Sequence, residues 1–359
     1  MAQAVATSGA VRKNTKKNPL SDGQGRLAAF LVAPTLAVIL FVVGIPIILS
    51  LQESFFRTND GVDPTTGLVS SGTKFVGLDN YVNAFTATSG SVSGVWGSMP
   101  RLLNAFANNI YFTVVCVLIE TVLGVAMALI MARAFKGTGF VRAAILIPWA
   151  IPTIVSAKLW MVIFDANGVM NRLIGRQVLW LGDSAASQWA VIAADVWKTA
   201  PFIGLLTLAG LQNIPAEVYE AAKVDGATAW QQFTRITLPL VKPALVVAVL
   251  FRTLDTMRMF DLPYGLIGPN KYSVETLSMF AFNEARSQRY GPAAAYSVLL
   301  FLLIVLVAFL FIKLLGADVV GDPETRAIAE QRKRMRKLHK EQVRKTRAAQ
   351  AITSGESAA

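Results

Sequence analysis

The residues of this chain best suited to chemistry are ionisable side chains inside strongly apolar segments. They are Glu120, Lys158, Asp195, Lys198, Arg252, Asp255 and Arg258. If these segments cross a bilayer, each charge near its centre costs roughly 2.5–3.5 kcal/mol on insertion scales. We therefore expect these side chains to face protein or water rather than lipid.

The spacing of these charges allows two interpretations. Asp195 and Lys198 lie three residues apart on one predicted helix, as do Arg252, Asp255 and Arg258 on another. Side chains at that spacing can pair along one helix face. Such pairs could lock two helices together inside a bundle, or they could form the polar lining of a path. The two are not exclusive, and the sequence favours neither.

Enzymatic chemistry has little support in these residues. The one histidine, His339, lies in a basic tail, and the one cysteine, Cys116, lies in an apolar run. No cluster of histidines, cysteines or paired carboxylates accompanies Asp195 or Asp255 as a candidate catalytic acid, so we expect no catalytic residue and no metal site. The chain also has no G-x-x-x-x-G-K-[ST] phosphate loop. If ATP is involved, another polypeptide must bind it.

The composition is that of a membrane protein. Of the 359 residues, 54% are hydrophobic and only 16% are charged, with a mean hydropathy of +0.50. A soluble domain of this length carries about 25% charged residues. The net charge of +12 could indicate a nucleic-acid partner, but most of the excess lies in two tails and one short loop. That distribution is typical of the positive-inside rule and argues against nucleic acid.

Six segments are long and apolar enough to span a bilayer as helices. They are 27–51, 109–132, 143–164, 189–211, 238–261 and 293–315. The even number places both tails on one side, and their lysines and arginines make that side the cytoplasm. We therefore predict an all-α, multi-pass protein of the plasma membrane.

The remaining segments divide the chain around these spans. A basic N-terminal tail, 1–26, precedes the first span, and an irregular external loop, 52–108, follows it. A core, 109–315, holds the other five spans, with a short amphipathic external helix predicted at 273–287. Within the basic C-terminal tail, 316–359, residues 323–349 are interpreted as a solvated helix near anionic membrane lipid rather than as a specific docking site.

Residues 213–237 predict a small helical hairpin between two spans. Pro215 suits a first helical turn, and the first helix can run to Asp225, where Gly226 provides a left-handed stop. Thr228 then begins a second helix, with Gln231 completing a capping box. The topology places this hairpin in the cytoplasm.

The two helices of the hairpin have different surfaces. Trp230, Phe233 and Ile236 form an apolar stripe that we expect to fold back onto the membrane domain. Ala221, Ala222 and Gly226 leave a nearly bare face that another protein's backbone could approach. The alternative is an ordinary helix-turn-helix linker lying against the membrane.

The hairpin sequence "EAAKVDGATAWQQFTRITLP" resembles the EAA loop of permease subunits in binding-protein-dependent ABC importers. It has Glu-Ala-Ala, Asp-Gly-Ala and, after nine residues that follow the glycine, Ile-x-Leu-Pro. "GLDNYVNAF" at 77–85 and "AILIPWAIPTIVSAKLWMVIF" at 144–164 resemble the maltose-type carbohydrate permeases. "DVWKTAPFIGLLTLAGL" at 195–211 and "LFRTLDTMRMFD" at 250–261 are most similar to actinobacterial trehalose importer permeases. The resemblance covers about 27–315.

The resemblance implies a six-helix, type I ABC importer permease fold. In that family the helix around Glu-Ala-Ala is a coupling helix seated in a cleft of an ATPase subunit. By motif match, this role falls to Glu220, Ala221, Ala222, Asp225 and Gly226. The chain is then a non-catalytic subunit that binds no cofactor, and ATP and Mg belong to two ATP-binding subunits. A homologous second permease and an extracytoplasmic sugar-binding lipoprotein complete the implied assembly, in a bacterial cell membrane.

On this resemblance the solute is a sugar. Trehalose is the first expectation, followed by maltose, other oligosaccharides and glycerol phosphodiesters. The candidate residues of its path are Asp195, Trp197, Lys198, Arg252, Asp255 and Arg258. An ion-coupled secondary transporter or channel is the alternative, since intramembrane charges fit it. That alternative gives no reason for the hairpin.

Overall fold

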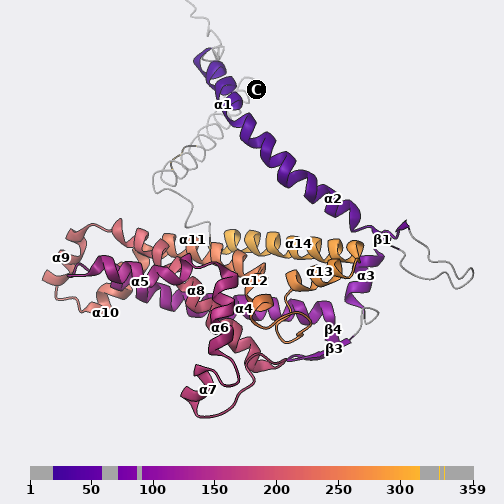
Figure 1. Cartoon of the computed structure of the whole chain (residues 1–359). Coiled ribbons are helices and arrows are strands. Elements are labelled where there is room, and N and C mark those ends of the chain that lie inside the picture. Colours follow the sequence, from indigo (N-terminus) through magenta and orange to yellow (C-terminus); the bar gives the residue numbers. More distant parts are fainter. Residues whose placement is uncertain (1–18, 59–71, 87–90, 316–330, 332–334, 336–359) are drawn as a thin grey trace, which may run out of the picture. The chain divides into compact units, whose positions relative to one another are not determined.

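The computed structural model describes residues 19–58, 72–86 and 91–315, together with Gln331 and Met335 (Figure 1). The chain divides into two compact units, residues 1–53 and 54–359, and each is described by itself. The predicted C-terminal helix and most of the basic tails lie outside the described residues.

The first unit is one long apolar helix. It runs through α1 (Pro19–Ile39), a π-helical turn η1 (Leu40–Gly44) and α2 (Ile45–Glu53). Residues 27–53 are long and apolar enough to span a membrane, and none of the most apolar window is buried. The π-helical turn has a local cause: Pro46 has no N–H to donate to the carbonyl of Val42, which leaves that turn to widen.

The second unit is a helical bundle with short strands at one end. Its α-helices are α3 (Asp79–Phe85), α4 (Arg101–Ala132), α5 (Thr138–Ala150), α6 (Thr153–Ile163), α7 (Val169–Ile174), α8 (Ala185–Gln212), α9 (Ala216–Val224), α10 (Ala229–Gln232), α11 (Leu238–Met257), α12 (Asp261–Leu266), α13 (Leu277–Arg286) and α14 (Tyr290–Leu315). A π-helical turn, η3 (Phe233–Thr237), joins α10 to α11. Within this unit, α9 and α10 lie at the end of the bundle opposite α3 and the strands (Figure 1).

The segment predicted as an irregular loop, 52–108, has regular structure in its described parts. Strand β1 (Phe56–Thr58) pairs antiparallel with β2 (Thr73–Phe75), and β3 (Ser91–Gly94) pairs antiparallel with β4 (Gly97–Pro100). The last residues of the segment belong to α4, which begins at Arg101 rather than near 109. Pro100 supplies the N-terminal boundary of that helix, and the asparagines of its first turns hide it from a hydropathy count.

Five described helices meet the length and hydropathy of a span, and a sixth candidate is broken. The span predicted at 143–164 is the broken one: α5 and α6 are bent by 95° between Ala150 and Thr153. Pro152 cannot donate a backbone hydrogen bond, and it disfavours the helical region for Ile151, whose ψ is 134°. The amphipathic helix predicted at 273–287 is confirmed as α13.

Helices α4 and α8 pack closely along the centre of this unit because glycines face each other there. A Cβ atom on Gly124 would come within 2.7 Å of the Ile203 side chain and 3.0 Å of the Gly204 backbone nitrogen. The fully buried side chain of Met131 lies beside this contact, with its terminal methyl carbon 3.4 Å from the position that a Cβ on Gly204 would take. The helix axes can therefore approach only where no side chain intervenes.

We predict that Gly124→Leu lowers the thermal stability of the detergent-solubilised protein, because overpacking a close contact costs about 1–3 kcal/mol. Gly139→Leu is the matched control, since a Cβ at that helical position of α5 meets nothing within 4 Å. Melting midpoints of the two variants should differ by several degrees. Equal midpoints would contradict the assigned α4–α8 contact.

Candidate functional site

The guanidinium of Arg252 forms the centre of a buried ionic cluster in the second unit. From α11, its Nε donates to Glu120 Oε2 of α4 at 2.6 Å, and its Nη2 donates to Glu120 Oε1 at 3.0 Å. Nη2 also donates to Asp195 Oδ2 of α8, and Nη1 donates to Asp255 Oδ2 at 2.9 Å. Thr199 Oγ1 donates to the same Glu120 oxygen, Oε1, at 2.7 Å.

This cluster ties three spans together. Arg252 is 3% exposed and Glu120 is fully buried. A charge in such surroundings is tolerated only when it is paired and hydrogen-bonded. The arrangement supplies the helix-locking role expected of these charges, with Arg252 rather than Lys198 as the partner of Asp195.

Lys198 makes a different contact from the one that its spacing allowed. Its Nζ donates to the carbonyl oxygen of Ile151 at 2.5 Å and to that of Trp149 at 3.5 Å. Both carbonyls lie where α5 ends. The ammonium group therefore caps the break between α5 and α6.

Arg252, Asp255 and Arg258 form a charged row along α11, and the last two face a cavity. Asp255 is half exposed and Arg258 largely so, and the two pair at 3.2 Å, the i,i+3 contact that the sequence predicts. Two adjoining cavities of about 270 Å³ each lie beside them and share Thr199, Arg252, Asp255 and Arg258. The first is also lined by Trp149, Phe202 and Phe251, and the second by Thr153, Asp195, Lys198, Met259, Phe260, Asp261 and Leu262.

Trp197 does not line either cavity. Its ring meets Trp160 at 5.8 Å, in an aromatic cluster that continues through Phe164 to Trp180. The structure therefore brings five of the six predicted path residues together around one cavity, and Trp197 packs in the aromatic cluster instead. Trp149 is one of the cavity-lining aromatic side chains that the sequence did not predict, because its position depends on the bend that follows it.

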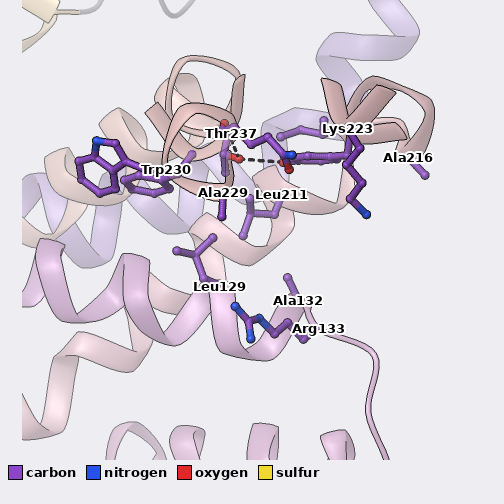
Figure 2. A pocket seen from close by; sticks show the side chains of 13 residues that line it. Leu129, Ala132, Arg133, Leu211, Ala216, Lys223, Ala229, Trp230 and Thr237 are labelled. Atoms are coloured by element: carbon purple, nitrogen blue, oxygen red, sulfur yellow. Dashed lines mark hydrogen bonds between the residues drawn. The ribbon is translucent and has the colours of Figure 1, made fainter. Parts of the chain in front are cut away.

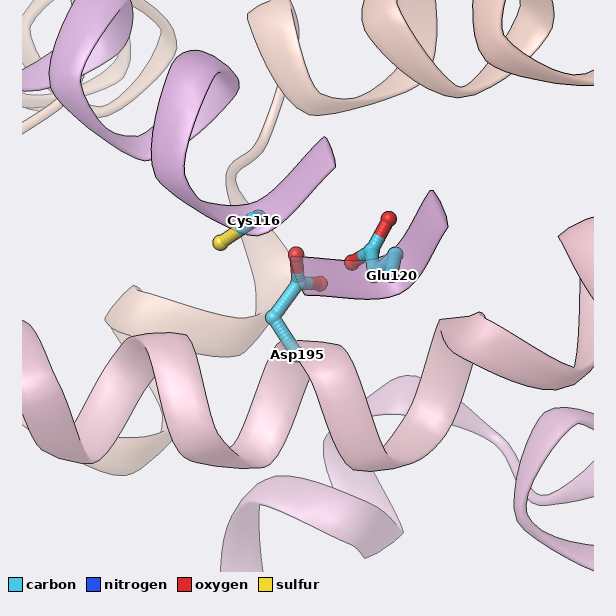
Figure 3. Close-up of side chains that lie close together, drawn as sticks. All are labelled: Cys116, Glu120 and Asp195. Carbon is cyan, nitrogen blue, oxygen red and sulfur yellow. The ribbon is translucent and has the colours of Figure 1, made fainter. Parts of the chain in front are cut away.

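Cys116, Glu120 and Asp195 lie close together between α4 and α8 (Figure 3). One potential ligand atom from each lies within 4.8 Å of the others, and all three residues are buried. Arg252 already donates to both carboxylates, so their negative charges are already paired with a cation. The cluster fits a guanidinium better than a divalent ion, whose charge would add to that of the arginine.

A second group of buried polar contacts, which the sequence analysis did not predict, joins the start of α4 to the segment before α13. Asn104 and Asn108 donate to the carbonyl of Tyr272 at 2.7 and 2.8 Å, and Arg101 binds Glu275 through two hydrogen bonds of 2.7 and 2.5 Å. Their i,i+4 spacing in an otherwise apolar helix was the available signal. Near these contacts, burial raises the pKa of Glu284 in α13 above its usual value, although the nearby charges of Arg289 and Arg101 act to lower it.

The hairpin has the local structure that its sequence predicts. Gly226 follows α9 with φ of 75°, and two hydrogen bonds complete a Schellman motif: Ala227 N–H to Ala222 O at 2.9 Å and Gly226 N–H to Lys223 O at 3.1 Å. The predicted capping box is confirmed, with Thr228 N–H donating to Gln231 Oε1 at 2.8 Å and Gln231 N–H to Thr228 Oγ1 at 3.3 Å.

The faces of the hairpin differ from expectation at two residues. Glu220, Ala221, Asp225 and Gly226 are exposed, but Ala222 is 8% exposed and faces inward. It therefore does not belong to the bare surface. Trp230, which the sequence placed in a packed stripe, is 71% exposed, because its indole lies beside Phe233 at 5.6 Å rather than under the bundle. Phe233 and Ile236 are half-buried.

A pocket of about 940 Å³ lies between the hairpin and the ends of the spans (Figure 2). One side comes from the end of α4, with Leu129, Ala132 and Arg133, and the other from α9 and α10. Inside it, the hydroxyls of Tyr219 and Thr237 are 3.1 Å apart in a hydrogen bond that joins α9 to η3. The hairpin is thus joined to α8 at one end and, through η3, to α11 at the other, and the pocket separates its middle from the end of α4.

These features define a helical membrane subunit with a buried ionic cluster and an exposed hairpin. Residues 120–320 match the family described as the binding-protein-dependent transport system inner membrane component, and the chain belongs to this family.

Individual relatives are similar over most of the chain. The trehalose/maltose transport system permease protein MalF of Thermococcus litoralis is 36% identical over 306 residues, which cover 84% of this chain and 97% of the relative. The trehalose transport system permease protein SugA of Mycobacterium tuberculosis is 38% identical over 297 residues, 82% of this chain and 91% of the relative.

The fold also matches a solved structure. A chain of a bacterial ABC transporter involved in the import of the acidic polysaccharide alginate superposes with a TM-score of 0.64 at 21% identity, covering 82% of this chain and 97% of that one. This likeness confirms the expected type I importer permease fold.

We predict that Arg252→Met strongly destabilises the protein, because removing one partner of a buried ion cluster costs about 3–5 kcal/mol. The yield of monodisperse detergent-solubilised protein and its melting midpoint should both fall. Adding Glu120→Gln and Asp195→Asn to that variant should recover part of the loss, since the unpaired charges are then removed. Arg258→Met, the same change on the exposed end of the helix, should have little effect. Equal losses in the two single variants would contradict the central role of Arg252.

Proposed function

We propose that this chain is one of two transmembrane subunits of an ATP-driven importer that carries a disaccharide, with trehalose first and maltose or another oligosaccharide next. The observation that carries the proposal is the exposed hairpin with a complete EAA motif, in a chain of the binding-protein-dependent transport family. The names of the two relatives support a sugar as the solute.

The hairpin is the proposed contact for a cytoplasmic ATPase subunit. Glu220, Ala221, Asp225 and Gly226 present the exposed surface, while Ala222 supports it from the inner side. ATP and Mg would bind to two partner ATPase subunits, which matches the absence of a phosphate loop from this sequence. Both tails would then lie in the cytoplasm, on the same side as the hairpin.

Movement of the hairpin would reach the membrane through two helices. The chain enters the hairpin from α8 and leaves it into α11. These helices are tied to each other by the hydrogen bond from Arg252 to Asp195. An ATPase that pulls on the hairpin would therefore move both helices as one unit, together with the cavity beside them.

The cavity beside Asp255 and Arg258 is the proposed section of the sugar path in this subunit. An exposed carboxylate and an exposed guanidinium can hydrogen-bond sugar hydroxyls, and aromatic faces such as that of Trp149 can lie against the apolar side of a sugar ring. The cavity is also lined by Asp195, Lys198 and Arg252. These three side chains already hydrogen-bond to protein groups. A homologous second permease would close the path, and an extracytoplasmic sugar-binding lipoprotein would deliver the solute.

The proposal is tested by co-purifying the complex and reconstituting it with its binding protein in vesicles. A panel should include trehalose, maltose, longer oligosaccharides and a glycerol phosphodiester. We expect one disaccharide to stimulate ATP hydrolysis and to accumulate in the vesicles only when ATP is present. Uptake that persists without ATP and collapses with an ion gradient would overturn the importer assignment.

We predict that Gly226→Leu abolishes uptake while leaving membrane insertion intact. An L-residue at this left-handed φ is strained by about 1–2 kcal/mol, and its side chain would project from the surface that the ATPase must approach. Uptake and co-purification of the ATPase subunit are the measurements.

Gly137→Leu provides the matched control. Gly137 also has positive φ, 91°, and open space at its Cβ, and it lies in the loop between α4 and α5. It should retain uptake within about twofold, since it carries the same backbone strain but lies outside the proposed docking surface. Normal transport by the Gly226 variant would refute the docking role.

A further inference from the structure

The break between α5 and α6 leaves carbonyl groups that need a partner. The last carbonyls of any helix have no intrahelical donor. Here the chain turns through 95° directly after α5, and Pro152 at the turn brings no N–H of its own. In the hydrocarbon core of a bilayer no water is available, so such groups need a partner within the protein or in a water-filled cavity.

Lys198 supplies the donor from a neighbouring helix. Its ammonium group lies at 2.5 Å from the carbonyl oxygen of Ile151 and 3.5 Å from that of Trp149, and the residue is only 8% exposed. A cation is also the favourable charge at the C-terminal end of a helix dipole. One side chain of α8 therefore contacts the chain at the end of α5, where the bend toward α6 begins.

The residues on either side of this break line the two cavities. Trp149, on α5, lines the cavity that also contains Phe202, and the two rings lie 6.0 Å apart. Thr153, on α6, lines the adjoining cavity with Asp255 and Arg258. The position of the bend thus decides where an aromatic ring and a hydroxyl stand relative to the exposed charged pair.

We propose that Lys198 is a positioning residue for the path: it sets the bend between α5 and α6, and through it the places of Trp149 and Thr153, and it does not bind the solute itself. This inference rests on the proposed function insofar as the cavities form the path. Asp195 lies one helical turn before Lys198 and belongs to the Arg252 cluster. The bend is therefore fixed to the same stretch of α8 that is fixed to α4 and α11.

The test uses the full transporter complex in vesicles, with Thr153→Cys as a reporter and the buried native Cys116 as the background. Labelling of the reporter by a soluble maleimide is measured without solute. Lys198→Met keeps an unbranched side chain of similar length and removes the donor. We expect the labelling rate to rise about tenfold, as the loss of a charged hydrogen bond would allow.

Uptake provides the second readout. The same Lys198→Met change, without the reporter, should raise KM for the solute more than it lowers kcat, because the path is misplaced rather than blocked. Lys198→Arg, which retains donors and charge, should restore both readouts most of the way. Lys158→Met, the same change at an exposed lysine of α6, should alter neither.

Two outcomes would overturn the inference. The first is unchanged labelling in Lys198→Met, which would show that the bend does not depend on the lysine; if KM rises in that case, Lys198 is a direct solute ligand. The second is a Lys198→Arg variant that recovers uptake but not labelling, because uptake would then not depend on the bend.

If the complex with Lys198→Met does not assemble, Lys198→Gln replaces it in the comparison. Glutamine is a shorter, neutral donor, so we expect an intermediate rise in the labelling rate. No rise would count against the proposal. Failure of the proposed function is distinguishable, because the unsubstituted complex would then take up no sugar while the labelling comparison still reports on the bend.

Discussion

The pairing of one buried guanidinium with carboxylates from three helices is the constraint on which the second unit depends. Arg252 and Glu120 are 132 residues apart in the chain and almost completely buried. The desolvation of such ions is repaid only in good geometry, with the remaining lone pairs satisfied. Here Nε and Nη2 bind both oxygens of Glu120, and Thr199 donates to one of them. A shift of α4, α8 or α11 along its axis would break these contacts, so the cluster fixes the relative register of the three helices.

The local structure of the hairpin could be predicted from sequence because it depends on neighbours in the chain. Gly226 and the Thr228–Gln231 pair obey short-range rules for ending and starting helices. The spans followed from hydropathy for the same reason. The inward orientation of Ala222 and the exposure of Trp230 did not follow, because they depend on how α9 and α10 sit on the rest of the bundle.

The partner of Arg252 and the break in the third predicted span illustrate what spacing alone leaves open. Asp195 is three residues from Lys198, yet each binds a group from another helix. The sequence also has two prolines in this region, Pro148 and Pro152, and only the second marks a sharp bend, since the first lies inside α5. What distinguishes them is a tertiary donor: the carbonyls at the second site receive the ammonium group of Lys198. No window of sequence around the prolines contains that information.

The three residues of the charged row on α11 have different roles because they differ in burial. Arg252 is 3% exposed at the side chain, whereas Asp255, one turn later, is 53% exposed and Arg258 is 71% exposed. A buried ion pair cannot exchange its partners for solute hydroxyls without a large desolvation cost, but an exposed pair loses little when a solute replaces one of its contacts. On the proposed function, Asp255 is the residue that connects the two roles, because one oxygen accepts from Arg252 and the other from Arg258. A sugar hydroxyl that displaces Arg258 would still meet a carboxylate held in place by the buried arginine. Binding specificity would then depend on Asp255, and Asp255 is held by Arg252, the residue that fixes the register of the three helices.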